Sequence, residues 1–506
     1  MAMAASALTE TIASLDVFVL TFNAGKQHVD PSVFAYHLRD AFARNTTGLP
    51  ELIVFCLQEM APLAESFIGP YMISSYYQKY ASAVNLAASH RLAAERGQVQ
   101  QGPWKEPEAD SREGSQDGHQ RRGDVPGSSP YTLVTTRNVG MTGIMLFARD
   151  PNAIHDLQST EVGFGAGGMA NKGAVGLRLL FSKEDAQGRE RQTELTFVGT
   201  HLTAHEWNLE NRNRNWETIV SGLLFGDPSG LCGAKSAYPT PHTSDDDDEA
   251  EALLSSDSRG KALRDITIYK PGSHLFVAGD LNYRISKTSP TSESKFPSLD
   301  PESPDYFTRF LALDQLTPEK AAGRTLHGLH ESPIHFPPTY KLEFAARDAA
   351  GTSDGDSQPA SPDVPTWDWA SHRWPGWCDR VLYLDIPRWA SGPSAATKAS
   401  MDTIAYDALP PVRTSDHRAV FLYIRVPVLE PSVLAPSPDV RASGSNDPRL
   451  KPPYPVDFEA WTHRARMKKW ESMIGWSMFI SQSKQGIALF TTLFLVGLGT
   501  WWLRSQ

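Results

Sequence analysis

The sequence has little cysteine, and its three cysteines lie far apart, at Cys56, Cys232 and Cys378. An odd number at such spacing provides neither a disulfide framework nor the clustered thiolates of a zinc site. We therefore expect a protein of the reducing cytosol. The first residues also lack a basic region, and Glu10 and Asp16 interrupt any apolar run, so no secretory signal is predicted.

An excess of positive charge is absent too. The 48 lysines and arginines are outnumbered by 58 aspartates and glutamates, which leaves a formal net charge of −10. Proteins that bind nucleic acid usually carry a basic surface, so this balance argues against a nucleic-acid partner. An apolar content of 40% and 13 tryptophans provide ample material for a core. The length of 506 residues allows two or three domains, or one large α/β domain with insertions.

One large domain is predicted from residue 14 to residue 426. Short apolar segments typical of strands alternate there with helical patterns and repeatedly end in polar residues, which indicates an α/β sandwich. No internal repeat is evident. Stretches rich in Gly, Pro, Ser and acidic residues interrupt this domain and are expected to be disordered insertions, at about 92–130, 226–260, 286–304 and 343–366.

The C-terminal region has a different composition. Residues 427–460 are rich in proline and predict a flexible linker, and 461–485 form a basic and aromatic segment suited to anionic headgroups. Residues 486–503 carry no charge, and a helix of that length spans roughly 27 Å, close to the thickness of a bilayer core. We therefore predict a C-terminal transmembrane tail anchor, with the large domain facing the cytosol because the basic residues precede the anchor.

The polar tip of one apparent strand is the strongest local signal. Leu275 to Ala278 is typical of a buried strand that ends at Gly279, and Asp280 and Asn282 follow it. Two residues apart on an extended backbone, they project to the same side and can share one site. The same pattern taken alone is equally consistent with an Asx-rich turn.

Other strand ends carry side chains of matching chemistry. Carboxylates and amides without cysteine form a hard-oxygen environment that suits Mg²⁺. A divalent ion with few protein ligands stabilises phosphoryl transfer, and a carboxylate can orient or deprotonate the attacking water. The side chains in question are Asn23, Glu59, His201, Asp280 with Asn282, Asp379 with Arg380, and Asp416 with His417.

Two long segments, FVAGDLNYR at 276–284 and PGWCDRVL at 375–382, closely resemble the signature motifs of the inositol polyphosphate 5-phosphatases. The resemblance extends over about 14–426. It implies the DNase I-like fold of the endonuclease/exonuclease/phosphatase superfamily, a four-layer α/β (α+β) sandwich in which two packed, mostly antiparallel sheets are flanked by helices. Shorter segments resemble further family blocks at 21–23, 57–59, 171–173, 200–206, 338–341 and 415–417.

The resemblance also implies a Mg²⁺-dependent removal of the 5-phosphate and assigns the catalytic roles by position. Asn23 and Glu59 would hold the metal. Asp280 would activate the water, and Asn282 would help to place the water and the phosphate. The remaining assignments are His417 on the scissile phosphate, Asp379 orienting His417, Asp416 beside the metal and His201 as a second phosphate contact.

Substrate contacts are implied in the same way. Tyr340, Lys341 and Arg380 fall where family members hold the 4-phosphate, and Asn171 and Lys172 fall where they hold the 1-phosphate. Lysine and arginine are the expected donors to phosphate. These positions favour phosphatidylinositol 4,5-bisphosphate as the substrate and phosphatidylinositol 4-phosphate as the product.

Residues 163–168 form a Gly-rich segment. Phe164 within it and Met169 just after it correspond to positions that touch acyl chains or the membrane surface in related enzymes. Core packing is the alternative for both. The tail anchor resembles that of fungal family members, which implies an endoplasmic reticulum membrane location.

Other functions stay open at this point. Activity on soluble inositol polyphosphates needs the same residues. A nuclease or a sphingomyelinase of the same superfamily would use the same Asn, Glu, Asp and His set, but a nuclease favours a basic surface and a sphingomyelinase needs no contacts to ring phosphates. A catalytically inactive, membrane-tethered lipid-binding scaffold is the non-enzymatic alternative.

Overall fold

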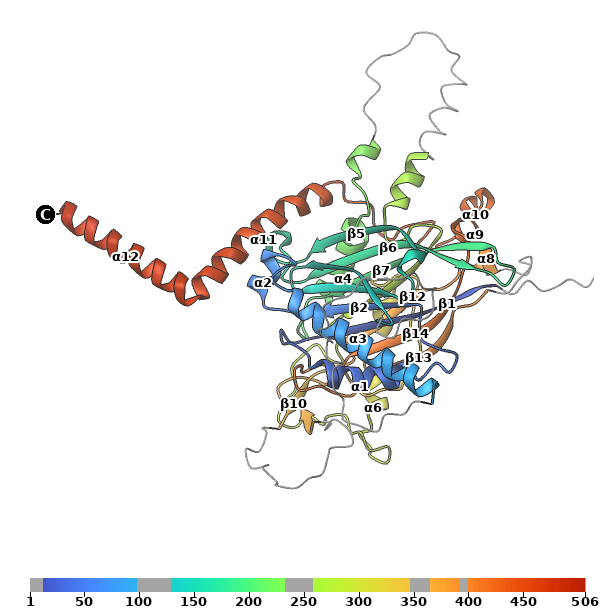
Figure 1. Ribbon diagram of the computed structural model, residues 1–506, viewed down its shortest axis with the longest axis horizontal. Coiled ribbons are helices and arrows are strands. Elements are labelled where there is room, and N and C mark those ends of the chain that lie inside the picture. Colours follow the sequence, from blue (N-terminus) through green and yellow to red (C-terminus); the bar gives the residue numbers. More distant parts are fainter. Residues whose placement is uncertain (1–11, 98–128, 233–257, 346–364, 392–398, 506) are drawn as a thin grey trace, which may run out of the picture.

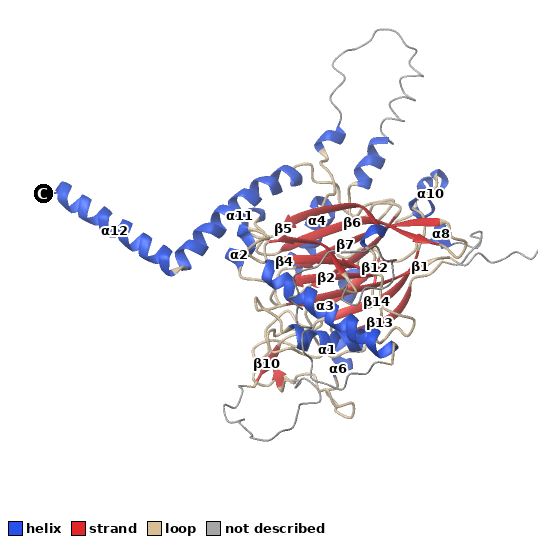
Figure 2. Cartoon of the chain, viewed as in Figure 1, coloured by secondary structure: helices blue, strands red, loops and turns tan. Residues whose placement is uncertain are grey.

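The computed structural model describes residues 12–97, 129–232, 258–345, 365–391 and 399–505. Two six-stranded β-sheets lie against one another, and helices flank them (Figure 1). Figure 2 separates the strands from the helices and shows the layers of this sandwich. The predicted four-layer fold is confirmed.

The first sheet contains both the first and the last strand of the large domain. Its strands pair antiparallel except for β1 and β2, which are parallel. The order across the sheet is β13 (Asp402–Ala408), β14 (Val420–Pro427), β1 (Ser14–Asn23), β2 (Leu52–Gln58), β4 (Thr142–Ala148) and β3 (Thr132–Val139).

The second sheet is also mixed, with β7 and β8 as its parallel pair. The order is β5 (Ile154–Gly163), β6 (Gly173–Glu184), β7 (Glu190–His201), β8 (Ser273–Asp280), β12 (Asp379–Leu384) and β9 (Leu329–His330). A separate two-stranded ribbon joins β10 (Leu342–Phe344) and β11 (Trp367–Trp369).

Helices cover the outer faces of both sheets because they present apolar sides to them. The core on the first sheet includes α1 and α3, and the core on the second includes α4. Asp30 caps α1 by accepting hydrogen bonds from the backbone N–H groups of Ser32 and Val33. The helices are α1 (Pro31–Phe42), α2 (Leu63–Ile68), α3 (Ser74–Glu95), α4 (Leu209–Gly222), α6 (Phe307–Leu311), α7 (Leu316–Ala321), α8 (Arg388–Ser391), α9 (Pro431–Leu434), α10 (Pro438–Ala442), α11 (Ala460–Gln482) and α12 (Lys484–Ser505).

Strand register brings the polar tips together at one end of the sandwich. Asp280 lies opposite Asp379 in the antiparallel pair β8–β12 and beside His201 in the parallel pair β7–β8. In the first sheet, Asn23 and Gln58 end the parallel strands β1 and β2 side by side. Strands that end at the same edge place their terminal side chains around one space, so the fold builds a site there.

The predicted insertions are partly visible. Residues 98–128, 233–257 and 346–364 lie outside the described residues, and the prediction for them stays open. At the first insertion α3 continues to Glu95. The segment 286–304 forms turns and loop, with one bridge between Ser298 and Tyr306 just beyond it.

The Pro-rich segment 427–460 is less free than its composition predicts. It contains α9 and α10, and Leu434 is 2% exposed in a small core with Ile386 and Ala390. Arg449 also donates to the backbone oxygen of Asp385. Buried apolar and polar contacts therefore hold parts of this segment against the large domain.

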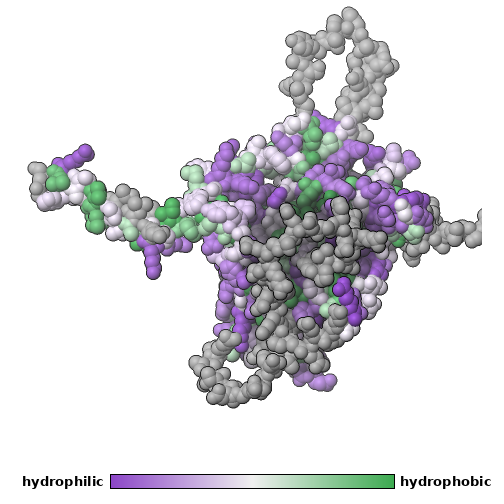
Figure 3. All heavy atoms as spheres, viewed as in Figure 1, coloured by the Kyte–Doolittle hydropathy of each residue, from purple (hydrophilic) through white to green (hydrophobic). Residues whose placement is uncertain are grey.

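The chain ends in two long helices, α11 and α12, the second of which projects from the body (Figure 1). Figure 3 shows hydrophobic residues along this arm. Phe494, Trp501 and Leu503 of α12 are exposed. Within the described ranges, no helix combines the length and the apolar character needed to cross a membrane. The transmembrane anchor at 486–503 stays a prediction.

Candidate active site

Asp280 lies at the centre of the converging strand ends and is 1% exposed. Its Oδ2 atom lies 3.2 Å from Nε2 of His201 and 3.9 Å from Nε2 of His417. The side-chain amide of Asn23 donates to the same oxygen at 3.1 Å. Burial disfavours the charged carboxylate, but His201, His417 and Lys172 outweigh it and hold the pKa of Asp280 well below its usual range.

His417 joins this centre through a second carboxylate. Its Nδ1 atom lies 2.9 Å from Oδ2 of Asp379, and the Thr339 hydroxyl donates to that same oxygen at 2.7 Å. Burial favours the neutral imidazole, yet the Asp379 and Asp280 carboxylates raise the pKa of His417 to about 9. The raised pKa favours the imidazolium form of His417, and Asp379 contacts its Nδ1 atom. The orienting role of Asp379 stays a prediction.

A divalent cation fits this end of the sandwich. Asp280, Asp379 and His417 offer ligand atoms that all lie within 4.8 Å of one another. The donors around them are carboxylate and amide oxygens, which suit a hard divalent ion. Which of these side chains coordinate the ion stays a prediction.

The predicted metal ligands Asn23 and Glu59 lie at the ends of neighbouring strands. Glu59 has a positive φ of 43° and forms an ion pair with Lys26 at 2.8 Å. Burial alone would raise the pKa of Glu59, but His201 and Lys26 lower it below its ordinary value. Asn23 is 3% exposed, and its Oδ1 atom accepts from the backbone N–H of Gly25. Both residues thus reach the site, and Glu59 stays ionised for a cation.

Lys172 and Asn171 approach the centre from the loop between β5 and β6. The ammonium group of Lys172 contacts Nε2 of His201, and burial lowers the pKa of Lys172 to about 8. Burial and the neighbouring ammonium both lower the pKa of His201. Asn171 is exposed. The position of the pair beside the catalytic centre agrees with a role in substrate binding.

Tyr340 and Lys341 lie on the opposite side of the centre. The rings of Tyr340 and His417 are 4.5 Å apart between centroids. The ammonium group of Lys341 pairs with the carboxylate of Asp416. Burial raises the pKa of Asp416, but His417 and Lys341 more than reverse this effect. These three predicted residues therefore lie next to His417, with Lys341 paired to Asp416.

Asn282 occupies a left-handed backbone position, with a φ of 57°. Its side-chain amide donates to the backbone oxygen of Leu202 at 3.0 Å, and its backbone N–H donates to Oδ1 of Asp280 at 3.1 Å. Asparagine tolerates this conformation better than most residues. The bond from the Asn282 backbone to the Asp280 carboxylate is that of an Asx turn, the alternative to two side chains projecting from an extended strand. The role of Asn282 in the site stays a prediction.

Arg284 is a site residue that the sequence-based assignment omits. It is 2% exposed, its guanidinium lies 4.3 Å from the centroid of the Tyr340 ring, and one of its NH groups contacts Oδ1 of Asn282. Its second terminal nitrogen is buried without a hydrogen-bond partner. A buried guanidinium group with one nitrogen left without a partner is suited to an anionic ligand. The signal was available, because Arg284 ends the first signature segment.

Arg380 requires a correction. Its guanidinium is 2% exposed, donates twice to Glu331 at 2.6 Å and lies 3.1 Å from Oδ2 of Asp314. Arg380 follows Asp379 on an extended strand, so their side chains point to opposite faces. The structure therefore places Arg380 in an internal ion-pair cluster, away from the 4-phosphate contact that the resemblance implies.

The two predicted lipid contacts differ in their surroundings. Phe164 is half-buried and packs against a core cluster that includes Leu202 and Trp216. Core packing, the alternative reading, thus accounts for Phe164 in part. Met169, on the same loop, is also half-buried.

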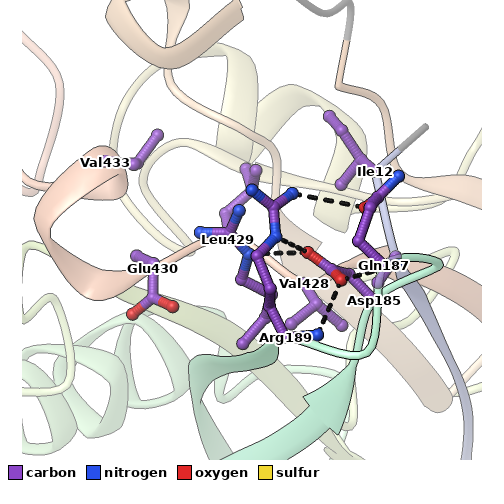
Figure 4. Close-up of a pocket in the computed structure, with 10 residues that line it drawn as sticks. Ile12, Asp185, Gln187, Arg189, Val428, Leu429, Glu430 and Val433 are labelled. Carbon is purple, nitrogen blue, oxygen red and sulfur yellow. Dashed lines mark hydrogen bonds and ion pairs between the residues drawn. The ribbon is translucent and has the colours of Figure 1, made fainter. Parts of the chain in front are cut away.

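A separate surface pocket of about 200 Å³ lies away from these residues (Figure 4). Its walls come from the turn between β6 and β7, which includes Asp185 and Arg189, and from Val428 to Val433 after β14. Arg189 and Asp185 pair there at 2.9 Å. This turn starts β7 at the end opposite His201, so the pocket takes no part in the site.

Comparisons with known proteins agree with the predicted superfamily. The model of endonuclease/exonuclease/phosphatase family 2 matches residues 20–423. Type II inositol polyphosphate 5-phosphatase 15 of Arabidopsis thaliana is 28% identical over 307 residues, which are 58% of this chain and 24% of that protein. Inositol-1,4,5-trisphosphate 5-phosphatase 1 of Schizosaccharomyces pombe is 27% identical over 296 residues, which are 58% of this chain and 19% of that protein.

The chain thus spans a quarter or less of the length of these relatives. Among solved structures, the inositol polyphosphate 5-phosphatase domain of SPsynaptojanin, in complex with inositol (1,4)-bisphosphate and calcium, aligns with a TM-score of 0.49 and 20% identity. The alignment covers 84% of this chain and 89% of that one. The family match spans every predicted site residue, from Asn23 to His417, and the chain belongs to endonuclease/exonuclease/phosphatase family 2.

Proposed function

We propose that this protein is a divalent-metal-dependent phosphatase that removes the 5-phosphate from inositol phosphates and phosphoinositides. One observation carries the proposal: an ionised Asp280 lies within 4 Å of two histidines, one of which Asp379 holds as an imidazolium. A carboxylate that stays ionised can orient the attacking water and accept its proton, and a cationic imidazole can stabilise charge on a phosphate oxygen. The names of the similar proteins support the choice of substrate class.

In the proposed reaction Asp280 orients a water molecule and accepts its proton as the oxygen attacks phosphorus. The P–O bond to the inositol ring breaks, and the ring oxygen leaves as a hydroxyl after it takes up a proton from solvent, while Asp280 returns its proton to solvent. His417 donates a hydrogen bond to a phosphate oxygen and stabilises the charge that develops there. Glu59 and Asn23 would hold a bound Mg²⁺ ion, and this ion would stabilise the developing charge as a Lewis acid.

The proposed lipid substrate is phosphatidylinositol 4,5-bisphosphate. Lys341 and Tyr340 lie beside His417, where a 4-phosphate neighbouring the reacting 5-phosphate would be reached. Asn171 and Lys172 lie across the centre, in the position proposed for the 1-phosphate. Arg380 is not among the proposed 4-phosphate contacts, because it pairs with Asp314. Arg284, which lies over the ring of Tyr340, is the buried guanidinium proposed near the substrate.

Attachment to the endoplasmic reticulum membrane through residues 486–503 is part of the same proposal. The exposed apolar residues of α12, among them Phe494 and Trp501, support it. Removal of residues 486–506 should shift the protein from the membrane fraction to the soluble fraction. A truncated protein that still sediments with membranes would refute attachment through this helix.

The deciding experiment measures phosphate release from a panel of phosphoinositides and soluble inositol phosphates, with Mg²⁺ and with EDTA. We expect release from 5-phosphorylated substrates alone, and its loss in EDTA. Sphingomyelin and DNA in the panel test the two other superfamily activities. Binding to lipid vesicles without turnover of any compound would favour the inactive scaffold and overturn the proposal.

A further inference from the structure

Helix α11 lies against the large domain next to the loop that carries Lys172. It contacts α2, β5, α4 and the short helix η2 (Ala166–Gly168) of that loop. Figure 1 shows α11 running along this side of the sandwich before the chain turns into α12. From its sequence, the segment 461–485 is expected at the membrane surface. Its inner face has a different role.

Glu471 is the central residue of this contact. It is 3% exposed, and its Oε1 atom accepts a hydrogen bond from the backbone N–H of Ala170 at 2.8 Å. Arg464, two turns earlier on the same face of the helix, donates to both carboxylate oxygens of Glu471 at 2.6 and 2.7 Å. A bidentate pair of this kind fixes the orientation of a carboxylate as well as its charge.

Further contacts hold α11 in this register. Arg464 also donates to Glu161 of β5 at 3.1 Å, and Lys468 lies 3.2 Å from the same carboxylate. His463 lies 2.9 Å from the backbone oxygen of Gly167 in η2. A Cβ atom at Gly475 would meet α2 at 2.8 to 3.0 Å, so only glycine allows the observed approach of the two helices.

The bond from Glu471 reaches the catalytic centre through a short, closed loop. Ala170 is fully buried and lies two residues before Lys172. Backbone bonds from Phe164 to Lys172, 2.8 Å, and from Gly165 to Met169, 2.7 Å, close the loop on itself. Lys172 contacts His201, which lies 3.2 Å from Asp280. A displacement at Ala170 is therefore transmitted to Lys172.

We propose that Glu471, oriented by Arg464, is a positioning residue that fixes the backbone at Ala170 and thereby the Asn171–Lys172 pair in the substrate site. The catalytic unit then includes α11 and extends beyond the predicted boundary at residue 426. Buried ionic contacts support this role, because a carboxylate is rarely buried without a specific partner. The kinetic test of this proposal rests on the proposed function, because it uses the proposed substrates. The structural test does not depend on that function.

The kinetic test compares inositol 1,4,5-trisphosphate with inositol 4,5-bisphosphate, which lacks the 1-phosphate. Glu471→Ala should lower kcat/KM for the first substrate roughly 10- to 100-fold, mainly through KM, because small displacements of binding groups are costly. The second substrate should lose much less. Glu471→Gln keeps an acceptor for the Ala170 backbone N–H, so its kcat/KM for inositol 1,4,5-trisphosphate should lie between those of the wild type and Glu471→Ala. Equal losses on both substrates would mean that Glu471 serves stability alone and would overturn the proposal.

Glu459→Ala is the matched control, because Glu459 lies at the start of the same helix and is exposed. It should match the wild type on both substrates. Gly475→Val moves α11 from α2 without altering Glu471 or Arg464, and should reproduce the pattern of Glu471→Ala. A soluble, folded Gly475→Val variant with unchanged kinetics on both substrates would contradict the proposal.

Hydrogen–deuterium exchange separates this proposal from the proposed function. Glu471→Ala should speed exchange of peptides covering residues 163–172, and Glu459→Ala should not. Unchanged exchange in Glu471→Ala would refute the positioning role whether or not the protein is a phosphatase. If the wild type releases no phosphate from either substrate, the proposed function fails, and faster exchange would still establish the contact between α11 and the loop.

Discussion

Two buried ionic clusters lie on opposite faces of the same pair of strands, β8 and β12. On one face Asp280 and Asp379 share His417, and Oδ1 of Asp379 has no hydrogen-bond partner. Two carboxylates facing a single imidazolium leave negative charge and unused hydrogen-bonding capacity. Such a centre is suited to binding a cation and, through it, a phosphate group.

On the other face Arg380 joins Asp314 and Glu331, and the hydroxyl of Tyr406 donates to Glu331 at 2.7 Å. Every one of these groups is buried or nearly so. This cluster also has two carboxylates for one guanidinium, but Arg380 donates three hydrogen bonds to them, and burial raises the pKa of Asp314. Asp379 thus belongs to the reactive cluster and Arg380 to the structural one. The two residues are consecutive, and their clusters are separated because side chains alternate between the faces of a strand.

Asp280→Asn should have the largest effect on the reactive cluster. The amide cannot accept the proton of the attacking water, so kcat should fall roughly 10³-fold, within the range of general-base catalysis. Phosphate release from phosphatidylinositol 4,5-bisphosphate measures the loss, and the circular dichroism spectrum and Tm control for folding. Appreciable turnover by a pure, folded variant would contradict the role of Asp280.

Arg380→Met should give the opposite pattern. Removal of the guanidinium leaves Asp314 and Glu331 buried without a counter-charge, which should lower the free energy of unfolding by about 3 kcal/mol. Because the cluster faces away from the site, kcat per folded molecule should stay near the wild-type value. Chemical denaturation and a titration of active sites separate the two quantities. A specific loss of activity on 4-phosphorylated substrates would restore Arg380 to the substrate site.

Asp379→Asn tests whether the Asp379 carboxylate keeps His417 protonated. The raised pKa of His417 means that the imidazolium persists below pH 9 and is lost as the pH rises through that value. Without the Asp379 charge, the alkaline limb of the kcat profile should move down by about one pH unit, the equivalent of about 1.4 kcal/mol. The pH–rate profile measures this shift. An unmoved alkaline limb would mean that another group controls it.

Lys341→Ala should have the smallest effect. Lys341 is a quarter exposed and pairs with Asp416, so its loss removes one partly screened contact. We expect kcat/KM for phosphatidylinositol 4,5-bisphosphate to fall roughly fivefold, about 1 kcal/mol, and a substrate without the 4-phosphate to change less. Lys295→Ala, in an exposed loop, is the control. A uniform loss on both substrates would argue against a 4-phosphate contact.

Much of the reactive cluster was predictable because its residues follow directly after strands. Asp280, His201 and Asn23 each end a buried run, and a strand end in a sandwich points to a shared edge. Asp379 and Arg380 are consecutive on a regular strand, so the alternation of strand side chains predicts that they point to opposite faces of the sheet. Arg284 was not predictable in this way, because the left-handed turn at Asn282 ends the regular alternation.

The C-terminal region marks the limit of prediction from composition. Tryptophans and basic residues in 461–485 are typical of a membrane surface, and Trp470 and Met473 are indeed exposed on the outer side of α11. The inner side of the same helix carries Glu471, whose partner Ala170 lies 301 residues away. Nothing local to either residue indicates the other.

The sequence by itself determined the chemistry and the fold class. Apolar runs that end in acids, amides and histidines require buried strands with polar tips, and hard-oxygen donors favour a divalent ion over softer chemistry. Only the tertiary structure decided which charges meet. The energy of a charge depends on its burial and on the groups within a few ångströms, and these neighbours come from distant segments, as Arg380 with Glu331 and Glu471 with Ala170 demonstrate.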